Sequence, residues 1–569
     1  MKNLATYIST VLFLISIVIL GGCGGTSSST STPPSSVAGK TSLDITDAPA
    51  SDYSHVYVTV TGVAFHVNAN SGFSDYSSAK NNGWQITRLA TPQTVDLAQL
   101  VNGKTFADKN GGAALFSGIT LPNGNYGQIR IFLASTDDAL TASASSLGLT
   151  YNNEVQLNGD TSHYPLHIPT PEEGIRLIPE SPVTVTDTSD VKLVLDFNLN
   201  NDIVETSPNG NIEFILKPRL GYFDMSSVGA ITGTVAFNNL STSHIVVKAE
   251  QIKSGANYRI TRRFTSPDKT SGAFALYPLP VFGNATTATY DVLIRGRNMD
   301  TAIIKNITVH KGTTPLSGSA GLGTITMQAD QEFTAQMLSP MKPTGAWINF
   351  YQTISNDSAA YEVRYRHLDP YTGKFFTPEP LSTGPIQVAT YTPGQTLAFA
   401  PDSTSKGVFS AVADAAGAYT RGAALTGVTG AAGAAVTMNF TGSELPQAST
   451  WNQITALFEM SLLGTGMGNG MGKQHNPSVV YPTKGQIFIT HGGMIVDSQG
   501  TLTQDTVVPN AMHAGGGVNN EVTISMPGGA NGDIYGVYAL GWGNGVLAAG
   551  TAHGVNLVNG NATATIRMK

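Results

Sequence analysis

Sulfur and imidazole side chains gather near the end of the chain, where they offer the donor set of a copper site. Met467, Met471 and His475 follow one another at intervals of four residues in a glycine-rich stretch, and thioether with imidazole suits copper. Methionine is also a common gap-filling residue of protein cores, and glycine-rich sequence is typical of loops. The sequence leaves both interpretations open and favours ordinary core or loop residues.

Carboxylates near the start of the folded chain are the candidates for binding a hard cation. Asp44 and Asp47 are followed by Asp52, and Ca²⁺ prefers carboxylate and carbonyl oxygens. Asp196 is a candidate fourth ligand. Asp47 precedes Ala-Pro, which is typical of an Asx turn, where the carboxylate accepts hydrogen bonds from backbone N–H groups. Because the spacing differs from that of an EF-hand loop, the turn is the favoured interpretation and the cation site is the alternative.

Aromatic residues in the last hundred residues are the candidates for contacting a sugar. Trp542 stands between two glycines, and Tyr535 and Tyr538 precede it. A tryptophan in a turn can stack its flat face on a sugar ring, but such rings more often pack against the edge of a sandwich. These three residues are the predicted ligand-binding set, with simple packing as the favoured alternative.

Motifs that carry catalysis are missing from the sequence. It contains no C-x-x-C-H for haem, no H-E-x-x-H, no G-x-S-x-G and no P-loop. We therefore expect neither enzyme activity nor a bound cofactor. The net charge of −7 without a basic patch also argues against nucleic acid as a partner.

The first 22 residues are expected to form a secretory signal. Lys2 supplies a positive start, residues 11–20 are apolar apart from one serine, and two glycines precede Cys23. Such an order is typical of a signal peptide, and the apolar run is too short for an ordinary membrane span. Residues 20–23, Leu-Gly-Gly-Cys, resemble the bacterial lipobox, in which the chain is cut before a cysteine that carries diacylglyceryl.

That resemblance implies a lipid anchor on Cys23. It is the only cysteine, so it cannot form a disulfide within the chain, and each buried methylene of an acyl chain contributes about 0.8 kcal/mol to membrane binding. Gly24 follows in place of the aspartate that favours inner-membrane retention in enteric lipoproteins, which implies the outer membrane or the cell surface. Residues 23–39, rich in Gly, Ser, Thr and Pro, are expected to form a flexible linker.

Beyond the linker, the sequence predicts an all-β protein made of several consecutive β-sandwich domains of immunoglobulin-like and transthyretin-like type. Charged residues are only 12% and there are 62 glycines, an unusual balance for a soluble domain. Alternating segments such as 55–61 and 191–197 predict strands, and many short strands between Gly, Asn and Pro predict sandwiches. The best helix candidate, residues 451–463, amounts to one short helix at most.

The first domain, expected at residues 40–226, carries a recognisable set of motifs. It opens with Thr-Asp-Ala-Pro at 46–49, continues with Gly83-Trp84 and G-x-Y-x-Q-I-R at 124–130, and has Leu-Asp-Phe at 195–197. This set resembles the bacterial lipoprotein family of domain of unknown function 4382, whose activity is uncharacterised. The resemblance implies a β domain and no particular chemistry.

Three further domains are expected, at 228–328, 329–443 and 444–569. The first of these, with Gly-Ala-Ile-Thr-Gly-Thr-Val at 229–235 and Leu-Gly-Thr-Ile-Thr-Met at 322–327, is similar to carboxypeptidase-regulatory, transthyretin-like sandwiches. That family implies a spacer or adhesive module, and some relatives bind carbohydrate. The other two each close with a methionine-bearing strand, at 436–438 and 566–568.

Together these features predict a non-catalytic, lipid-anchored protein of the cell envelope that serves as a surface structural, adhesion or docking module. Its expected partners are the membrane, through the N-terminal lipid, and a protein or glycan at the cell surface. The alternative is a ligand-binding surface lipoprotein that engages carbohydrate, or a metal such as Cu or Ca, through the C-terminal or transthyretin-like domain.

Overall fold

The computed structural model describes most of the chain from residue 38 onward. The described ranges are 38–47, 53–71, 83–101, 103–206, 212–218, 220–330, 332–338, 347–369, 374–382, 384–414, 421–422, 425–429, 435–437, 440–441, 450–461, 479–480, 484–491, 494–497, 508–509, 520–528, 534–543 and 546–568.

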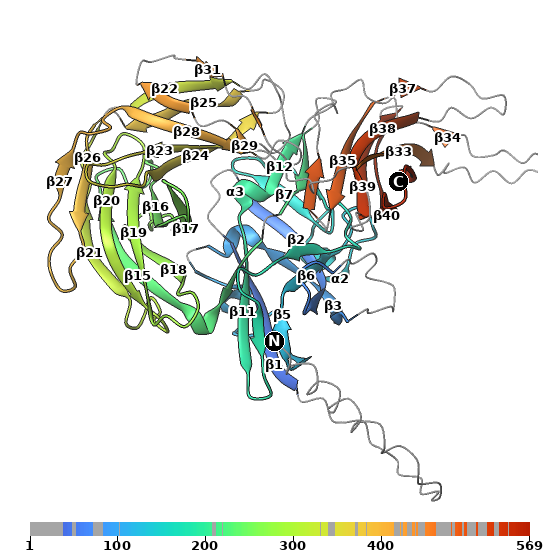
Figure 1. Ribbon diagram of the computed structural model, residues 1–569, viewed down its shortest axis with the longest axis horizontal. Helices are drawn as coiled ribbons and strands as arrows, with labels where there is room; N and C mark the ends of the chain where they lie inside the picture. The colour runs from blue at the N-terminus through green and yellow to red at the C-terminus, as the bar shows by residue number, and fades with distance from the viewer. Residues whose placement is uncertain are drawn as a thin grey trace, which may run out of the picture. The chain divides into compact units, whose positions relative to one another are not determined.

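The all-β fold class is confirmed, because strands dominate the described residues and the α-helices are single turns (Figure 1). These helices are α1 (Phe106–Lys109), α2 (Ala142–Ser146) and α3 (Leu199–Asp202). In the described part of the chain, no helix combines the length and apolar character needed to cross a membrane.

The first unit contains two large sheets around one core. The four-stranded sheet has the order β14 (Gly221–Asp224), β11 (Asp190–Phe197), β1 (Ala38–Asp47) and β4 (Phe116–Pro122). The eight-stranded sheet has the order β12 (Ile203–Thr206), β13 (Glu213–Leu216), β8 (Tyr164–His167), β7 (Glu154–Leu157), β2 (Tyr53–His66), β6 (Gln128–Leu133) and β9 (Ile175–Leu177), with β3 (Gln85–Asp96) on β2.

The predicted alternation in residues 55–61 is confirmed within β2. Val56, Val58 and Val60 are fully buried, as expected where every second side chain of a strand faces the core. They join Leu43 of β1 and Phe197 of β11 in one apolar cluster that holds both sheets together.

The second unit pairs a small sheet with a large one. The small sheet has the order β18 (Ala273–Pro280), β15 (Val228–Ala236) and β21 (Ala320–Thr326). The large sheet has the order β17 (Arg259–Thr265), β16 (Val246–Ile252), β19 (Thr287–Arg295), β20 (Ala302–His310), β26 (Ile386–Thr390) and β27 (Ala400–Asp402) (Figure 1). The parallel pairing of β20 with β26 therefore extends this sheet beyond the predicted boundary at residue 328.

The third unit is built on a seven-stranded sheet. Its order is β30 (Leu425–Thr429), β28 (Val408–Asp414), β23 (Trp347–Gln352), β24 (Tyr361–Asp369), β25 (Lys374–Ser382), β22 (Glu332–Leu338) and β31 (Ala435–Thr437). A separate two-stranded sheet in the same part of the chain pairs β29 (Arg421–Gly422) with β32 (Phe440–Thr441).

The last unit has two sheets. One contains β34 (Val479–Val480), β33 (Thr450–Ser461), β38 (Asn520–Gly528) and β37 (Val508–Pro509), with β41 (Ala562–Met568) on β33, and the other contains β36 (Met494–Asp497), β35 (Lys484–His491), β39 (Ile534–Gly543) and β40 (Val546–Asn556). The best helix candidate, residues 451–463, is not a helix in its described part, which ends at residue 461. Residues 451–461 belong to β33, which pairs on both sides, with β38 and β41.

Candidate functional site

Asp44 and Asp47, the predicted cation ligands, lie in β1 with their carboxylates turned to backbone groups. Asp44 Oδ2 accepts the N–H of Ala107 at 2.9 Å, and Asp47 Oδ1 accepts the N–H of Leu199 at 3.2 Å. Burial, together with the charge of Asp196, raises the pKa of Asp47 well above its ordinary value. Among the residues that the structure describes, no group of three or more His, Cys, Asp or Glu side chains is placed to hold a metal ion.

Tyr535 and Tyr538, the predicted sugar-stacking residues, are buried in β39. The Tyr535 hydroxyl donates to the Pro527 carbonyl at 2.8 Å, and the Tyr538 ring centroid lies 6.1 Å from that of Phe488. Both rings therefore serve as core residues, as the packing interpretation expects. Trp542 lies near the end of the same strand, opposite Lys484 and Leu547 in the pairing, and its side chain is outside the description.

The other predicted site residues fall outside the described ranges. They are Cys23, the predicted lipid-bearing residue, Asp52 of the predicted cation ligands, and the copper candidates Met467, Met471 and His475.

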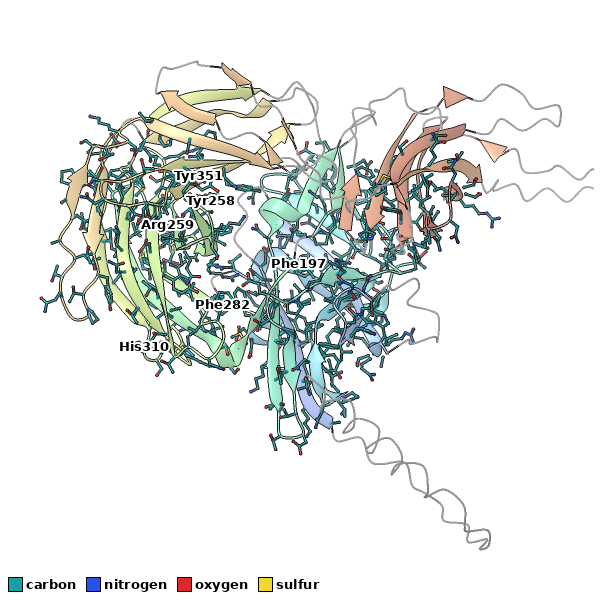
Figure 2. All side chains as sticks on the ribbon, in the orientation of Figure 1. Phe197, Tyr258, Arg259, Phe282, His310 and Tyr351 are labelled. Carbon is teal, nitrogen blue, oxygen red and sulfur yellow. The ribbon has the colours of Figure 1, made fainter. Side chains whose placement is uncertain are left out.

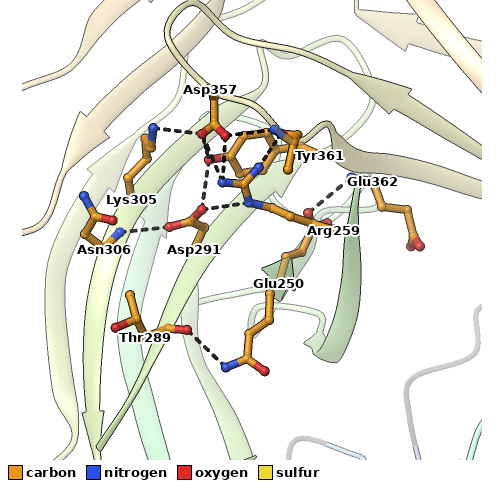
Figure 3. A network of polar contacts seen from close by, with 11 residues as sticks. Glu250, Arg259, Thr289, Asp291, Lys305, Asn306, Asp357, Tyr361 and Glu362 are labelled. Carbon is orange, nitrogen blue, oxygen red and sulfur yellow. Dashed lines mark hydrogen bonds and ion pairs between the residues drawn. The ribbon is translucent and has the colours of Figure 1, made fainter. Parts of the chain in front are cut away.

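The charged side chains that the structure does bring together lie where the second unit meets the third. We call this group the junction network, and Figure 3 labels all of its members except Lys248. Its members come from β16, β17, β19 and β20 of the second unit, and from β24 and the turn before it in the third. They are Lys248, Glu250, Arg259, Asp291, Lys305, Asp357, Tyr361 and Glu362.

Arg259 is the centre of the network, between two carboxylates (Figure 3). Its Nε donates to Asp291 Oδ2 at 2.9 Å, and Nη2 reaches both oxygens of Asp357 at 3.1 and 3.0 Å. Nη1 donates to the Ala359 carbonyl, and the guanidinium lies 3.8 Å from the centroid of the Tyr361 ring. With an exposed fraction of 3%, Arg259 uses its planar fork as buried arginines do, in a two-pronged pairing with stacking.

Lys305 and Tyr361 complete the contacts of the same two carboxylates. Lys305 Nζ lies 2.8 Å from Asp357 Oδ2, and the single proton of the Tyr361 hydroxyl is shared between Asp291 Oδ2 at 2.9 Å and Asp357 Oδ2 at 3.1 Å. Burial acts to raise the pKa of Asp357, but the Lys305 hydrogen bond and the nearby positive charges outweigh it and hold that pKa below its usual value. Burial and the charge of Asp291 raise the pKa of Tyr361, so its hydroxyl stays a donor.

Lys248, Glu250 and Glu362 form the other end of the network. Lys248 Nζ lies 2.7 Å from Glu362 Oε1, which also accepts the Thr261 hydroxyl at 2.9 Å. Glu250 is fully buried and accepts the Glu362 N–H at 3.2 Å. Burial, opposed by Lys248 and reinforced by Glu362, raises the pKa of Glu250 to about 8. Near neutral pH Glu250 is therefore largely protonated, and three cations face the three other carboxylates.

A second buried arginine of β17 contacts the first unit. Arg263 Nη1 lies 2.5 Å from Asp196 Oδ1, Nη2 donates to the Asp47 carbonyl at 3.1 Å, and Nε donates to the Tyr277 carbonyl at 3.1 Å. The pairing of β16 with β17 shifts register between the two arginines, and such a bulge re-aims the side chains beyond it. Arg259 and Arg263, four residues apart, thus reach different units.

An aromatic pair adds apolar contact at the junction of the second and third units. The rings of Tyr258 and Tyr351, both labelled in Figure 2, lie 5.4 Å apart at an interplanar angle of 57°. Such tilted pairs contribute beyond the area they bury.

The chemistry of these groups is mutual pairing. Each charged member of the junction network contacts an oppositely charged one, and the neutral Glu250 accepts a backbone hydrogen bond. Buried charges are tolerated under these conditions. Sequence motifs did not predict this site, although one feature of the sequence points to it. Charges within apolar strands, as in Val-Val-Lys-Ala-Glu at 246–250, stand out in a chain with 12% charged residues.

Comparison with known proteins gives a family match for one part of the chain. Residues 38–218 match the family model described as domain of unknown function (DUF4382), which confirms the resemblance drawn from the motifs of the first unit. No curated protein matches the chain.

Solved structures give only distant similarity. Two variants of the shaft pilin SpaA from Lactobacillus rhamnosus GG each align with 42% of this chain and 98% of their own, at 10% identity, with TM-scores of 0.17 and 0.18. The pilus adhesin SpaC from the same organism, in an open conformation, aligns with 90% of this chain and 56% of its own, at 9% identity and a TM-score of 0.13. Similarity at this level carries no argument about function.

Proposed function

We propose that this chain is a non-catalytic structural module of the cell surface, in which buried charged junctions hold β domains in a fixed succession. The observation that carries the proposal is the junction network, because it places charged side chains where two units meet and pairs them with one another.

Buried ion pairs favour orientation over stability. The desolvation of two charges offsets much of their attraction, and apolar residues of equal volume often stabilise a protein as well or better. Domains in one chain usually move relative to one another unless their interface is large and apolar. The fork of Arg259 on Asp291 and Asp357 instead requires one relative orientation of the second and third units. Such a joint suits a spacer or a docking platform.

The last unit also contacts the first in a way that supports a fixed arrangement. His553 Nε2 lies 3.0 Å from Glu172 Oε2, and the hydroxyls of Thr170 and Thr490 lie 3.4 Å apart. Beside them, one apolar cluster combines residues of both units, namely Ile215, Phe488, Tyr538, Leu540 and Ala549. These contacts join strands far apart in sequence, as a structural module needs.

The proposed location is the cell envelope, with the chain held by a lipid on Cys23 at the outer membrane or the cell surface. The apolar segment and the Leu-Gly-Gly-Cys sequence at 20–23 support it. Its proposed partners are the membrane, through that lipid, and a protein or glycan of the surface.

Small-angle X-ray scattering tests the structural role. The full chain carrying Cys23→Ala, which avoids the lipid, is compared with the same chain carrying Arg259→Met and Arg263→Met. We expect the parent to fit one arrangement of its domains and the double variant to require an ensemble. Arg262→Met, on the same strand, is the control and should scatter like the parent. A parent chain that already requires an ensemble of domain arrangements would overturn the proposal.

A further inference from the structure

A small pocket lies at the edge of the second unit, away from the junctions described above. Its volume is about 170 Å³, and its lining includes Asp300, Thr326, Met327, Gln328, Gln387 and Phe399. They combine four polar residues of three kinds with an aromatic residue and a methionine.

The extension of the large sheet by β26 and β27 builds this pocket. Ala302, at the start of β20, is the register partner of Gln387 in β26, and the Gln387 N–H donates to the Thr301 carbonyl at 2.8 Å. Because β27 pairs with β26, Phe399, directly before β27, lies at the same edge. Figure 1 shows β20, β21, β26 and β27 close together. Residues from two predicted domains therefore form one wall.

Asp300 is a fixed polar group within the pocket. Its Oδ1 accepts the Gln328 N–H at 3.0 Å, and its own N–H donates to the Gln328 carbonyl at 2.9 Å. Its exposed fraction is 4%. Held in this way by the backbone, the carboxyl group needs no reordering to accept a hydrogen bond from a ligand, and such preorganisation favours binding.

The chemistry of the lining matches a hydroxylated ring. A carboxyl group accepts hydrogen bonds, the two carboxamides both donate and accept, and the threonine hydroxyl does either. The Phe399 ring offers a flat apolar surface of the kind that stacks on the C–H face of a sugar. The volume is below the range of about 300–1,000 Å³ that is typical of drug-sized ligands, so the pocket has room for a single ring.

We propose that this pocket binds one neutral pyranose residue, with hydroxyls on Asp300, Gln328 and Gln387 and the ring face on Phe399. The inference goes beyond the structural role proposed above and does not depend on the junctions. A rigid surface module with such a pocket has a chemical basis for contact with envelope or host glycans.

Ligand titration of the full chain tests the proposal. The probes are the methyl glycosides of glucose, galactose, mannose and N-acetylglucosamine, observed by saturation-transfer NMR and calorimetry. We expect saturable binding of at least one of them in the millimolar range that is typical of a single-ring contact. Asp300→Asn and Phe399→Ala should each weaken that binding by about tenfold, since each removes one of the few groups that orient the ligand.

Two exposed residues outside the pocket provide matched controls. Phe282→Ala removes a phenylalanine that is 41% exposed (labelled in Figure 2), and Asp190→Asn removes a carboxylate whose side chain is 66% exposed. Both should bind within about twofold of the parent, because surface substitutions leave a distant site unchanged. If Asp300→Asn lowers the thermal midpoint of the chain, Gln387→Ala replaces it in the comparison.

Three results would overturn the proposal. The first is that none of the four glycosides binds. The second is that the pocket variants bind as tightly as the controls. The third is that tetramethylammonium, a cation that also fits a carboxylate beside an aromatic face, binds in the pocket while the glycosides do not. None of these results bears on the scattering test, so failure of this proposal is separate from failure of the structural one.

Discussion

Replacement of Arg259 by methionine is the sharpest test of the junction network. Methionine keeps much of the side-chain volume but removes the charge and the hydrogen bonds to Asp291, Asp357 and Ala359. Breaking a buried pair by removing one partner typically costs about 3–5 kcal/mol, because the other charge stays buried. Asp357 keeps Lys305, and Asp291 keeps the hydrogen bond from Tyr361, so we expect the lower end of that range.

Hydrogen exchange and calorimetry measure this loss. In the full chain, peptides covering β17, β19 and β24 should open about 3 kcal/mol more easily, since local opening free energies follow local contacts. For a cooperative unit of 150–250 residues, about 3 kcal/mol lowers the midpoint by about 6–12 °C. The calorimetric transition that includes the second and third units should shift by this amount.

The neighbouring Arg262 provides the matched control on the same strand. It lies 3.1 Å from Glu180, whose side chain is 59% exposed, and such exposed pairs contribute at most about 1 kcal/mol. Arg262→Met should therefore have a small effect. Adding Asp291→Asn to Arg259→Met should recover part of the loss, because it removes a carboxylate left without its main cation. Equal effects of Arg259→Met and Arg262→Met would refute the reasoning.

Three further predictions address the titration of the network, the anchor and the metal candidates. Glu250 has a pKa of about 8 in the folded chain against an ordinary value of 4.5, so the folded state binds its proton more tightly. The contribution of this proton to the free energy of unfolding is fully present when the pH is below the ordinary pKa, and it is lost as the pH rises through the folded-state pKa. In thermal unfolding measured from about pH 5 to 9, the Glu250→Gln variant should become more stable relative to the parent as the pH rises. A difference in thermal midpoint that stays constant over this pH range would contradict the assignment. Cys23→Ala should move the protein out of the detergent-rich phase in phase partitioning, whereas unchanged partitioning would rule out the lipid anchor. Addition of Cu(I) or Ca²⁺ should leave the thermal midpoint of the full chain unchanged, because a ligand of the folded state must raise it; a specific rise abolished by substitution of Met467, Met471 and His475 would reverse that expectation for copper.

The sequence predicts local features of this fold well. Alternation identified strands within β2 and β11, because one side of each faces a core and side chains alternate along a strand. Residues 451–461, the described part of the best helix candidate, form a strand because pairing decides their structure. β33 has a partner on each side, from about 70 and 110 residues further along the chain, and tertiary context of this kind overrides local propensity.

The candidate site was beyond sequence reasoning for the same physical reason. Arg259 and Asp357 are 98 residues apart and Lys248 and Glu362 are 114 apart, so no spacing along the chain relates them. Conversely, Asp44 and Asp47 are close in sequence, yet the structure turns their carboxylates to the N–H groups of different distant segments. β1 lies inside its sheet, between β11 and β4, and each of its two carboxylates accepts one backbone N–H there.

The seven residues of β17 have a consequence for how such a chain can change. This one strand supplies Arg259 to the third unit and Arg263 to the first. Exchange of the second unit for a homologous sandwich would therefore disrupt two interfaces at once, and each would leave an unpaired carboxylate on its neighbour. In many proteins, recombination exchanges independent domains. In this chain such an exchange should be selected against, so the first, second and third units should be inherited together.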